Sequence, residues 1–192
     1  MINLIKNHLD KVTKKTYSTG ELIFSENESC NKVGIVIKGE ISIKSYFSNG
    51  QEVTYNVIKS GQMFGNNLIF SSKPAYRGDV IADTDSEIYF VNKENLLLIM
   101  KEDDEFLMKY LAMQSDFSKT LNLKIKLLTI SSANDRLLYY LTFNNNKISY
   151  KTITKLANEL YLTRESLSRT IKYLKDKKII KIDSKTITLM VD

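Results

Sequence analysis

The sequence predicts an α+β chain in which a β-roll, of the barrel or jelly-roll kind, precedes a long helix and a small helical module with a terminal hairpin. Three observations support this order. All seven glycines lie between residues 16 and 91, where apolar residues recur with period two. Residues 103–130 contain neither glycine nor proline. Residues 152–192 combine two short helical patterns with two short apolar runs.

The N-terminal part is predicted to form a helix and then a series of strands. Residues 2–15 carry apolar side chains at helical spacing, so a short amphipathic helix is expected there. The Asn49-Gly50 pair is a strong signal for a hairpin turn. Many short strands joined by glycine turns are typical of a barrel or a jelly roll. The alternating segments that predict these strands are 20–26, 32–46, 52–59 and 86–91.

Two helices are predicted after the strands, a short one over 92–100 and a long one over 103–130. A helix of roughly 28 residues spans about 42 Å, which is longer than a small domain needs. A second copy of the same helix would cover its apolar stripe in a coiled-coil-like homodimer, and packing against the chain's own domains is the alternative. The stripe consists of Tyr110, Met113, Phe117, Leu121, Ile125 and Leu128.

The C-terminal part is predicted to hold three helices and a hairpin. Asn134 or Asp135 is expected to cap a helix over 136–143. Two further helices flank a tight turn near 160–163, and two short strands flank the turn Asp183-Ser184-Lys185. This order is typical of a winged helix–turn–helix, a DNA-binding module. The expected domains are a β-roll over 1–102, a dimerisation helix and hinge over 103–133, and a winged helix–turn–helix over 134–192.

Positive charge is concentrated in the last of these domains. Residues 1–133 hold 16 basic and 16 acidic residues, whereas residues 134–192 hold 12 basic and 6 acidic ones. The whole formal net charge of +6 therefore lies in the C-terminal part. A small domain with this excess is a candidate for binding a polyanion, and a basic surface that is merely solvated is the alternative.

The stretch 162–174 has two distinct faces if it is helical. Four polar residues, Arg164, Glu165, Ser168 and Arg169, fall with Lys172 within an arc of roughly 140°. Leu167, Ile171 and Leu174 share a separate apolar arc, and Thr163 is a suitable N-cap. Taken alone, this pattern fits an ordinary amphipathic surface helix equally well.

Several short motifs give the sequence a resemblance to a known family. They are "KGEISI" at 38–43, the spacing of Gly50, Gly61 and Gly65, the pair Asp135-Arg136, and "TRESLSR" at 163–169. With these motifs the chain resembles the Crp/Fnr family of bacterial transcriptional regulators. The resemblance implies a cyclic-nucleotide-binding-like β-roll, a long dimerisation helix and a C-terminal winged helix–turn–helix. It also implies a cytoplasmic homodimer that binds double-stranded DNA at an inverted repeat and, as an activator, would touch RNA polymerase.

The resemblance assigns roles in reading DNA to the polar face of helix 163–174. Arginine can bond guanine O6 and N7 together, glutamate can accept from cytosine N4, and serine can donate or accept. We therefore expect Arg169 to contact guanine, Glu165 the cytosine opposite, and Ser168 a neighbouring thymine in TTGA- or TGA-like half-sites. Arg164 would add a second guanine contact or bind a phosphate. The positions that match phosphate-contacting residues of the family are Thr152, Thr163, Ser166 and Lys185.

One residue of the turn departs from the family pattern. The turn between the two helices usually holds glycine, and here it holds Tyr161. If this position requires a positive φ, tyrosine costs roughly 1 kcal/mol or more there.

The residues at the expected effector pocket do not favour cyclic AMP. Asn66 stands where the family's cAMP receptors have a ribose-binding carboxylate, Arg77 is displaced by one residue from the phosphate-binding arginine, and Leu121 replaces a threonine that meets adenine. A one-residue shift along a strand turns a side chain to the opposite face. An unknown polar or anionic effector is the remaining small-molecule hypothesis. The pocket positions are Gly65, Asn66, Asn67, Tyr76, Arg77, Leu121 and Asn122.

Other functional classes find little support in the sequence. One cysteine, Cys30, cannot hold an iron–sulfur cluster of the Fnr type, and His8, the only histidine, is expected to be an ordinary surface residue rather than a haem ligand. No residues are placed for enzymatic catalysis or for a metal site. The N-terminus lacks a signal-peptide core and no apolar run could span a membrane. The competing hypothesis is a small-molecule-binding or protein-interaction module that has the cyclic-nucleotide fold but does not bind specific DNA.

Overall fold

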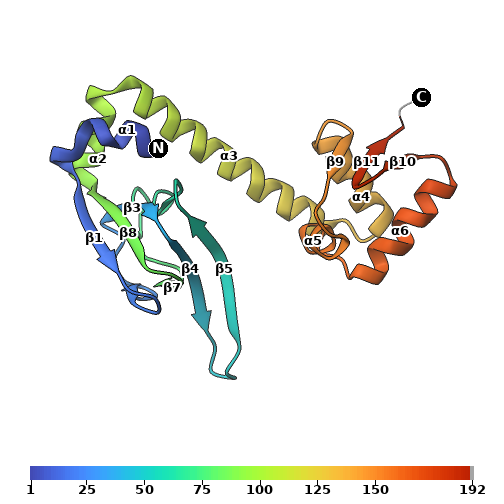
Figure 1. Ribbon diagram of the computed structural model, residues 1–192, viewed down its shortest axis with the longest axis horizontal. Helices are drawn as coiled ribbons and strands as arrows, with labels where there is room; N and C mark the ends of the chain where they lie inside the picture. Colours follow the sequence, from blue (N-terminus) through green and yellow to red (C-terminus); the bar gives the residue numbers. More distant parts are fainter. Residues whose placement is uncertain (191–192) are drawn as a thin grey trace. The chain divides into compact units, whose positions relative to one another are not determined.

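The computed structural model describes residues 1–190 and divides into two compact units, unit 1 over Met1–Asp116 and unit 2 over Phe117–Asp192 (Figure 1). Each unit has its own core of buried apolar side chains. The long helix α3 (Asp104–Thr129) contributes its first turns to unit 1 and its last turns to unit 2. No helix within residues 1–190 combines the length and the apolar character that crossing a membrane requires.

Unit 1 is built around two four-stranded antiparallel sheets, with the strand orders β1-β8-β3-β6 and β2-β7-β4-β5. Figure 1 shows them as the two layers of a β-roll. This arrangement confirms the α+β class and the β-roll. The strands are β1 (Thr13–Tyr17), β2 (Leu22–Phe24), β3 (Lys32–Lys38), β4 (Glu40–Tyr46), β5 (Glu52–Lys59), β6 (Met63–Phe64), β7 (Asp79–Ala82) and β8 (Ser86–Asn92).

The N-terminal segment differs from the prediction. Instead of one helix over 2–15, the chain forms α1 (Ile2–Ile5), the 3₁₀ helix η1 (Lys6–Lys11) and then strand β1. Strand β1 pairs with β8 from Thr13 opposite Phe90 to Tyr17 opposite Ser86. These ladder hydrogen bonds to a distant strand override the local helical spacing of apolar residues, which was the only basis for the prediction.

Aromatic side chains fill the space between the two sheets. The ring of Phe24 stacks on that of Tyr76 with centroids 4.4 Å apart, and Phe90 meets Phe24 edge to face at 5.7 Å. Gly34 lies under this cluster, and a Cβ there would lie 2.2 Å from carbons of the Phe64 ring. The sheet can approach the ring only because this residue is glycine. Cys30 is also buried in this core, as a small apolar residue would be.

Two contacts attach the helices of unit 1 to the rest of the unit, one to the N-terminal segment and one to the β-roll. Helix α2 (Lys93–Glu102) is capped by Asn92, and after it the carboxylate of Asp103 lies 2.9 Å from His8 Nε2. His8 is therefore largely buried and paired, and its prediction as an ordinary surface residue is wrong. The hydroxyl of Tyr110 in α3 donates to the backbone oxygen of Asn66 at 2.7 Å, and burial raises the pKa of Tyr110 to about 12.

The Asp103 carboxylate is expected to make stability depend on acid pH. The hydrogen bond with His8, and then that from the Phe106 backbone N–H, hold the pKa of Asp103 below its usual value. A lowered folded-state pKa stabilises the protein above the unfolded pKa of about 4, and this contribution is lost as pH falls through the folded pKa. In urea unfolding, Asp103→Asn should be less stable than wild type at pH 6, with a smaller difference at pH 3. A difference that stays constant over this range would contradict the assignment.

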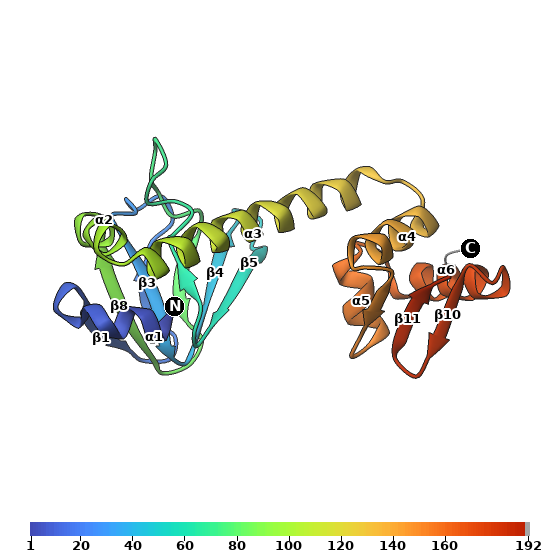
Figure 2. The ribbon, with the colours of Figure 1, turned by 90° about the horizontal axis from the view of Figure 1, so that it is seen from above.

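Unit 2 holds three helices after α3 and a small three-stranded sheet of order β10-β11-β9. The helices and the terminal hairpin lie where the sequence predicts them, whereas β9 was not predicted. The N-cap of α4 is Ser132, which accepts from the Asp135 backbone N–H, rather than Asn134 or Asp135. In Figure 2 the β10–β11 hairpin lies beside α6. The elements are α4 (Ala133–Phe143), β9 (Lys147–Ser149), α5 (Ile153–Glu159), α6 (Arg164–Asp176), β10 (Ile180–Asp183) and β11 (Thr186–Leu189).

Candidate nucleic-acid interface

A tight turn joins α5 to α6. The Leu162 backbone N–H donates to the oxygen of Ala157 at 2.9 Å, and the Tyr161 N–H donates to the oxygen of Asn158 at 3.1 Å. This pair of bonds defines a Schellman motif, in which the residue at the Tyr161 position takes a left-handed conformation. Tyr161 has φ of +54°, so the conformation that usually favours glycine is adopted here by tyrosine.

Arg136 of α4 holds this turn from outside. Its guanidinium donates to the backbone oxygen of Tyr161 at 2.8 Å and to that of Leu160 at 3.3 Å. The same group donates twice to the oxygen of Ile130, through Nε at 2.9 Å and Nη2 at 2.6 Å. One side chain thus ties the segment after α3 to the turn before α6. The sequence marks Arg136 only as part of a family motif and gives no sign of these contacts.

Removing this guanidinium is expected to destabilise unit 2. Because Arg136→Ala leaves three backbone oxygens without their charged donor, we expect a loss of about 2–4 kcal/mol in the free energy of unfolding. Arg136→Lys should recover only part of it, since one ammonium cannot replace a planar fork of donors. Chemical denaturation and hydrogen exchange at the turn would measure both effects. Equal stability of Arg136→Ala and wild type would contradict this role.

Helix α6 turns one face to the core and the other to solvent. Leu167, Thr170 and Leu174 are buried, while the side chain of Thr163 caps the helix by accepting from the Ser166 N–H at 3.1 Å. The apolar arc and the N-cap agree with the sequence prediction, and Thr170 is an addition to the buried side. The residues on the exposed side include Arg164, Glu165, Ser168, Arg169 and Lys172.

The charged groups of this exposed face have no ion-pair partner within residues 1–190. Neither Arg169 nor Glu165 forms an ion pair with any side chain that the structure describes. Arg169 Nε donates to the backbone oxygen of Glu165 at 3.4 Å, which leaves both terminal nitrogens of the guanidinium available for another partner. A helix face with an unpaired guanidinium, a carboxylate and a hydroxyl can donate and accept hydrogen bonds over a small area.

The four residues predicted to contact phosphates occupy three different places. Thr152 and Thr163 are the N-caps of α5 and α6, and each hydroxyl oxygen accepts from a backbone N–H. Each hydroxyl proton therefore remains available for donation to an anion. Ser166 lies half-buried in the first turn of α6, and Lys185 lies exposed in the turn between β10 and β11.

The apolar stripe of α3 divides into an exposed and a covered part. Phe117, Leu121, Ile125 and Leu128 are 46–58 % exposed. Tyr110, predicted on the same stripe, instead lies in the core of unit 1 at 4 % exposure, and Met113 packs partly against that core. The reason is the hydrogen bond of Tyr110 to the loop at Asn66, which the helical period does not reveal.

The residues predicted for an effector pocket lie partly in unit 1 and partly in unit 2. Tyr76 is 1 % exposed and stacked on Phe24, so this side chain fills the core rather than lining a pocket. Gly65 and Asn66 form a loop whose Asn66 backbone oxygen also accepts from Gln114 at 2.9 Å. The side chains of Asn67 and Arg77 are exposed in unit 1, and Leu121 and Asn122 belong to unit 2.

Comparison with protein families and solved structures extends these observations. Residues 14–103 match the family model of the cyclic nucleotide-binding domain. The comparison with curated proteins found no match.

Three solved structures illustrate the likeness. A transcriptional regulator from Thermotoga maritima is 26% identical with a TM-score of 0.61, over 65% of this chain and 97% of that one. The catabolite activator protein of Thermus thermophilus is 18% identical with a TM-score of 0.59, over 99% and 91%. FixK2 of Bradyrhizobium japonicum is 21% identical with a TM-score of 0.51, over 94% and 93%. The resemblance to the Crp/Fnr family is thereby confirmed: residues 14–103 match the cyclic nucleotide-binding domain, and the chain is similar over most of its length to the catabolite activator protein of Thermus thermophilus.

Proposed function

We propose that the protein is a sequence-specific DNA-binding transcriptional regulator that acts as a homodimer. In this proposal α5, α6 and the β10–β11 hairpin form a winged helix–turn–helix, and residues 163–174 form the recognition helix. The observation that carries it is the exposed and unpaired polar face of α6, which presents Arg164, Glu165, Ser168 and Arg169. A carboxylate on a face aimed only at phosphates would repel them, so Glu165 favours contact with bases.

The charge distribution supports contact with nucleic acid. Residues 134–192 contain 12 basic residues. None of them forms an ion pair with another residue that the structure describes. Basic side chains without acidic partners are available to replace the counterions of a DNA backbone. Thr152, Thr163, Ser166 and Lys185 are the proposed phosphate contacts.

A homodimer would explain the exposed apolar residues on α3. Phe117, Leu121, Ile125 and Leu128 recur at helical spacing and lie on one side of the helix. A second copy of α3 would remove this stripe from water and give the protein a two-fold axis. A two-fold protein requires a DNA site with two inverted half-sites, about one helical turn apart, which we expect to contain TTGA- or TGA-like cores.

The test is selection of binding DNA from a random pool, with and without added cell metabolites. The proposed function requires recovery of an inverted repeat. If the selected pool stays random under both conditions, the protein is instead a small-molecule-binding or protein-interaction module without specific DNA binding. Recovery of a repeat only in the presence of metabolites would show that an effector is needed.

Cyclic AMP is not expected to be that effector. Asn66 offers no carboxylate to a ribose, and Arg77 lies before strand β7 with its side chain exposed. A ligand at 100 times its dissociation constant stabilises a protein by about 2.7 kcal/mol, which thermal unfolding detects readily. We expect no shift of the unfolding midpoint with millimolar cyclic AMP. A clear shift would mean that Arg77 reaches a phosphate site.

A further inference from the structure

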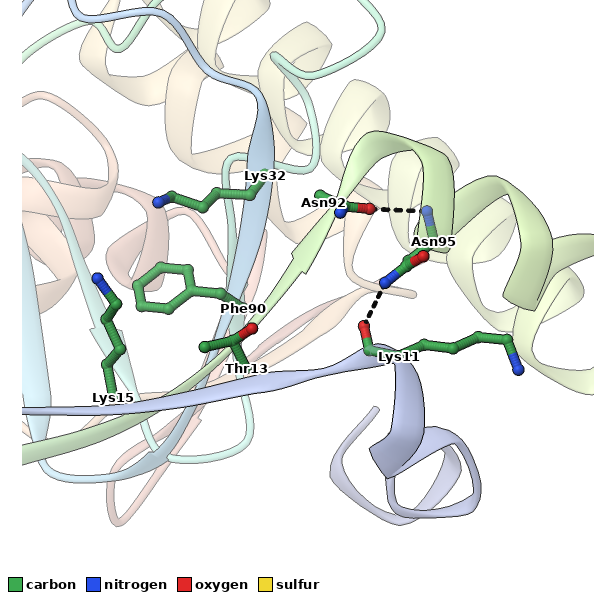
Figure 3. A pocket seen from close by; sticks show the side chains of 7 residues that line it. All are labelled: Lys11, Thr13, Lys15, Lys32, Phe90, Asn92 and Asn95. Carbon is green, nitrogen blue, oxygen red and sulfur yellow. Dashed lines mark hydrogen bonds between the residues drawn. The ribbon is translucent and has the colours of Figure 1, made fainter.

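A cavity of about 120 Å³ lies in the β-roll of unit 1, and none of its lining residues is one of those assigned to the effector pocket. It is bordered by strands β1, β3 and β8 and by the beginning of α2 (Figure 3). The register brings these strands together, because both Thr13 and Gly34 pair opposite Phe90. The lining residues are Lys11, Thr13, Lys15, Lys32, Phe90, Asn92 and Asn95.

The polar groups of this lining are mostly hydrogen-bond donors, and none of the lining residues is acidic. The side-chain oxygen of Asn92 is already used, since it accepts from the Asn95 N–H at 2.8 Å. The amide nitrogen of Asn95 donates to the Lys11 backbone oxygen at 2.9 Å. Among the residues described, the Asn92 amide nitrogen and the Thr13 hydroxyl have no partner, so both remain available to donate.

Two of the three lysines differ from the third in having no ion-pair partner in the part of the chain that the structure describes. The ammonium of Lys11 is paired with Glu102 at 3.0 Å and with Asp10 at 3.2 Å. Lys15 and Lys32 have no ion pair among the residues described. In Figure 3 their ammonium groups extend toward the same side of the Phe90 ring, whereas that of Lys11 points away.

Aromatic rings hold one of these charges in place. The Lys32 ammonium lies 5.1 Å from the centroid of Phe24 and 5.3 Å from that of Phe90, both within the range of cation–π attraction. Two ammonium groups directed to one small cavity repel each other. An anion bound between them would attract both and offset this repulsion. A volume of about 120 Å³ has room for a small anion and is small for a nucleotide.

From these observations we infer that the cavity between β1, β3 and β8 binds a small oxyanion, in the form of a phosphate or a carboxylate group. Lys15 and Lys32 supply the charge, and Thr13 and Asn92 supply neutral donors. This inference goes beyond the proposed function, since it concerns unit 1 and involves no DNA.

The experiment is an NMR titration of the full-length protein with sodium phosphate and, separately, sodium succinate, each referenced to sodium chloride at equal ionic strength. Because the basic residues of unit 2 also attract anions, the readout is restricted to the amide resonances of Thr13 and Phe90 and the side-chain amide of Asn92. We expect saturable shifts with at least one of the two anions, and the more effective anion identifies the ligand class.

The matched variants separate this site from general anion binding. The double variant Lys15→Met/Lys32→Met retains the aliphatic part of both side chains. It should raise the dissociation constant of the anion at least tenfold. The control Lys73→Met removes one exposed charge of the same unit outside the cavity and should titrate as wild type does. The inference is overturned if the wild-type resonances do not move with either anion, or if the double variant titrates like wild type. Neither result would bear on DNA binding, which is measured separately.

Discussion

Replacing Arg169 by alanine is expected to weaken binding of the selected operator by about 2–6 kcal/mol for two half-sites, or roughly 30-fold to 10⁴-fold. Arg169 Nε bonds within α6, so its two terminal nitrogens can meet O6 and N7 of one guanine. The variant should also lose its preference at one base pair of each half-site. Gel-shift titrations with the operator and with single-base variants of it would measure both effects.

Lys185→Ala is the control for this experiment. Lys185 lies in the turn between β10 and β11, far along the chain from α6, and is proposed to contact a phosphate. Its loss should weaken operator and random DNA alike and reduce the salt dependence by about one ion per subunit. If Arg169→Ala also weakened both DNAs equally, the polar face of α6 would bind phosphates and the assignment to bases would be wrong.

Placing glutamate at both Phe117 and Leu121 is expected to convert a dimer into a monomer at micromolar concentration. Both side chains are about half-exposed in the single chain and would be dry in the proposed dimer. Burial of unpaired carboxylates costs several kcal/mol, so the dimer dissociation constant should rise at least about 1000-fold, equivalent to roughly 4 kcal/mol. Analytical ultracentrifugation would measure this change.

A matched variant removes the effect of net charge from this comparison. Ser115→Glu/Lys119→Gln changes the net charge by the same amount at exposed positions on the opposite side of α3. It should remain a dimer and bind the operator. A wild-type protein that is monomeric at micromolar concentration, or a Phe117→Glu/Leu121→Glu protein that stays dimeric, would contradict the proposed interface.

Local patterns predicted most of the elements. The period-two segments became β3, β4, β5 and β8, and the Asn49-Gly50 hairpin joins β4 to β5. The capping of α6 by Thr163 was predictable, because an N-cap acts within one turn of its helix. Features of this kind depend on neighbours within a few residues, and these neighbours are visible in a single sequence.

The errors arose where distant parts of the chain decide the outcome. Tyr110 has the helical spacing of the α3 stripe, but its partner is a backbone oxygen 44 positions away. The sequence predicted Lys15 at the end of a helix. Its actual position on strand β1 brings it to the same cavity as Lys32 and Phe90. Tyr76 was expected in a pocket because it aligns with the family's effector-binding positions, yet its ring stacks in the core. Helical period and residue type contain no information about these pairings.

The tyrosine at the α5–α6 turn has a practical consequence for protein engineering. A glycine turn keeps its shape by itself, whereas Tyr161 holds a left-handed conformation beside the guanidinium of Arg136. A fragment of 152–176 grafted onto a foreign scaffold would lose the hydrogen bond from Arg136 to the backbone oxygen of Tyr161. Tyr161→Gly should remove the steric cost of this conformation in such a graft, although the scaffold would still have to cover the buried side chains of Leu156 and Leu167. The turn of the proposed recognition segment therefore depends on one side chain outside the segment, Arg136, and on one residue within it, Tyr161.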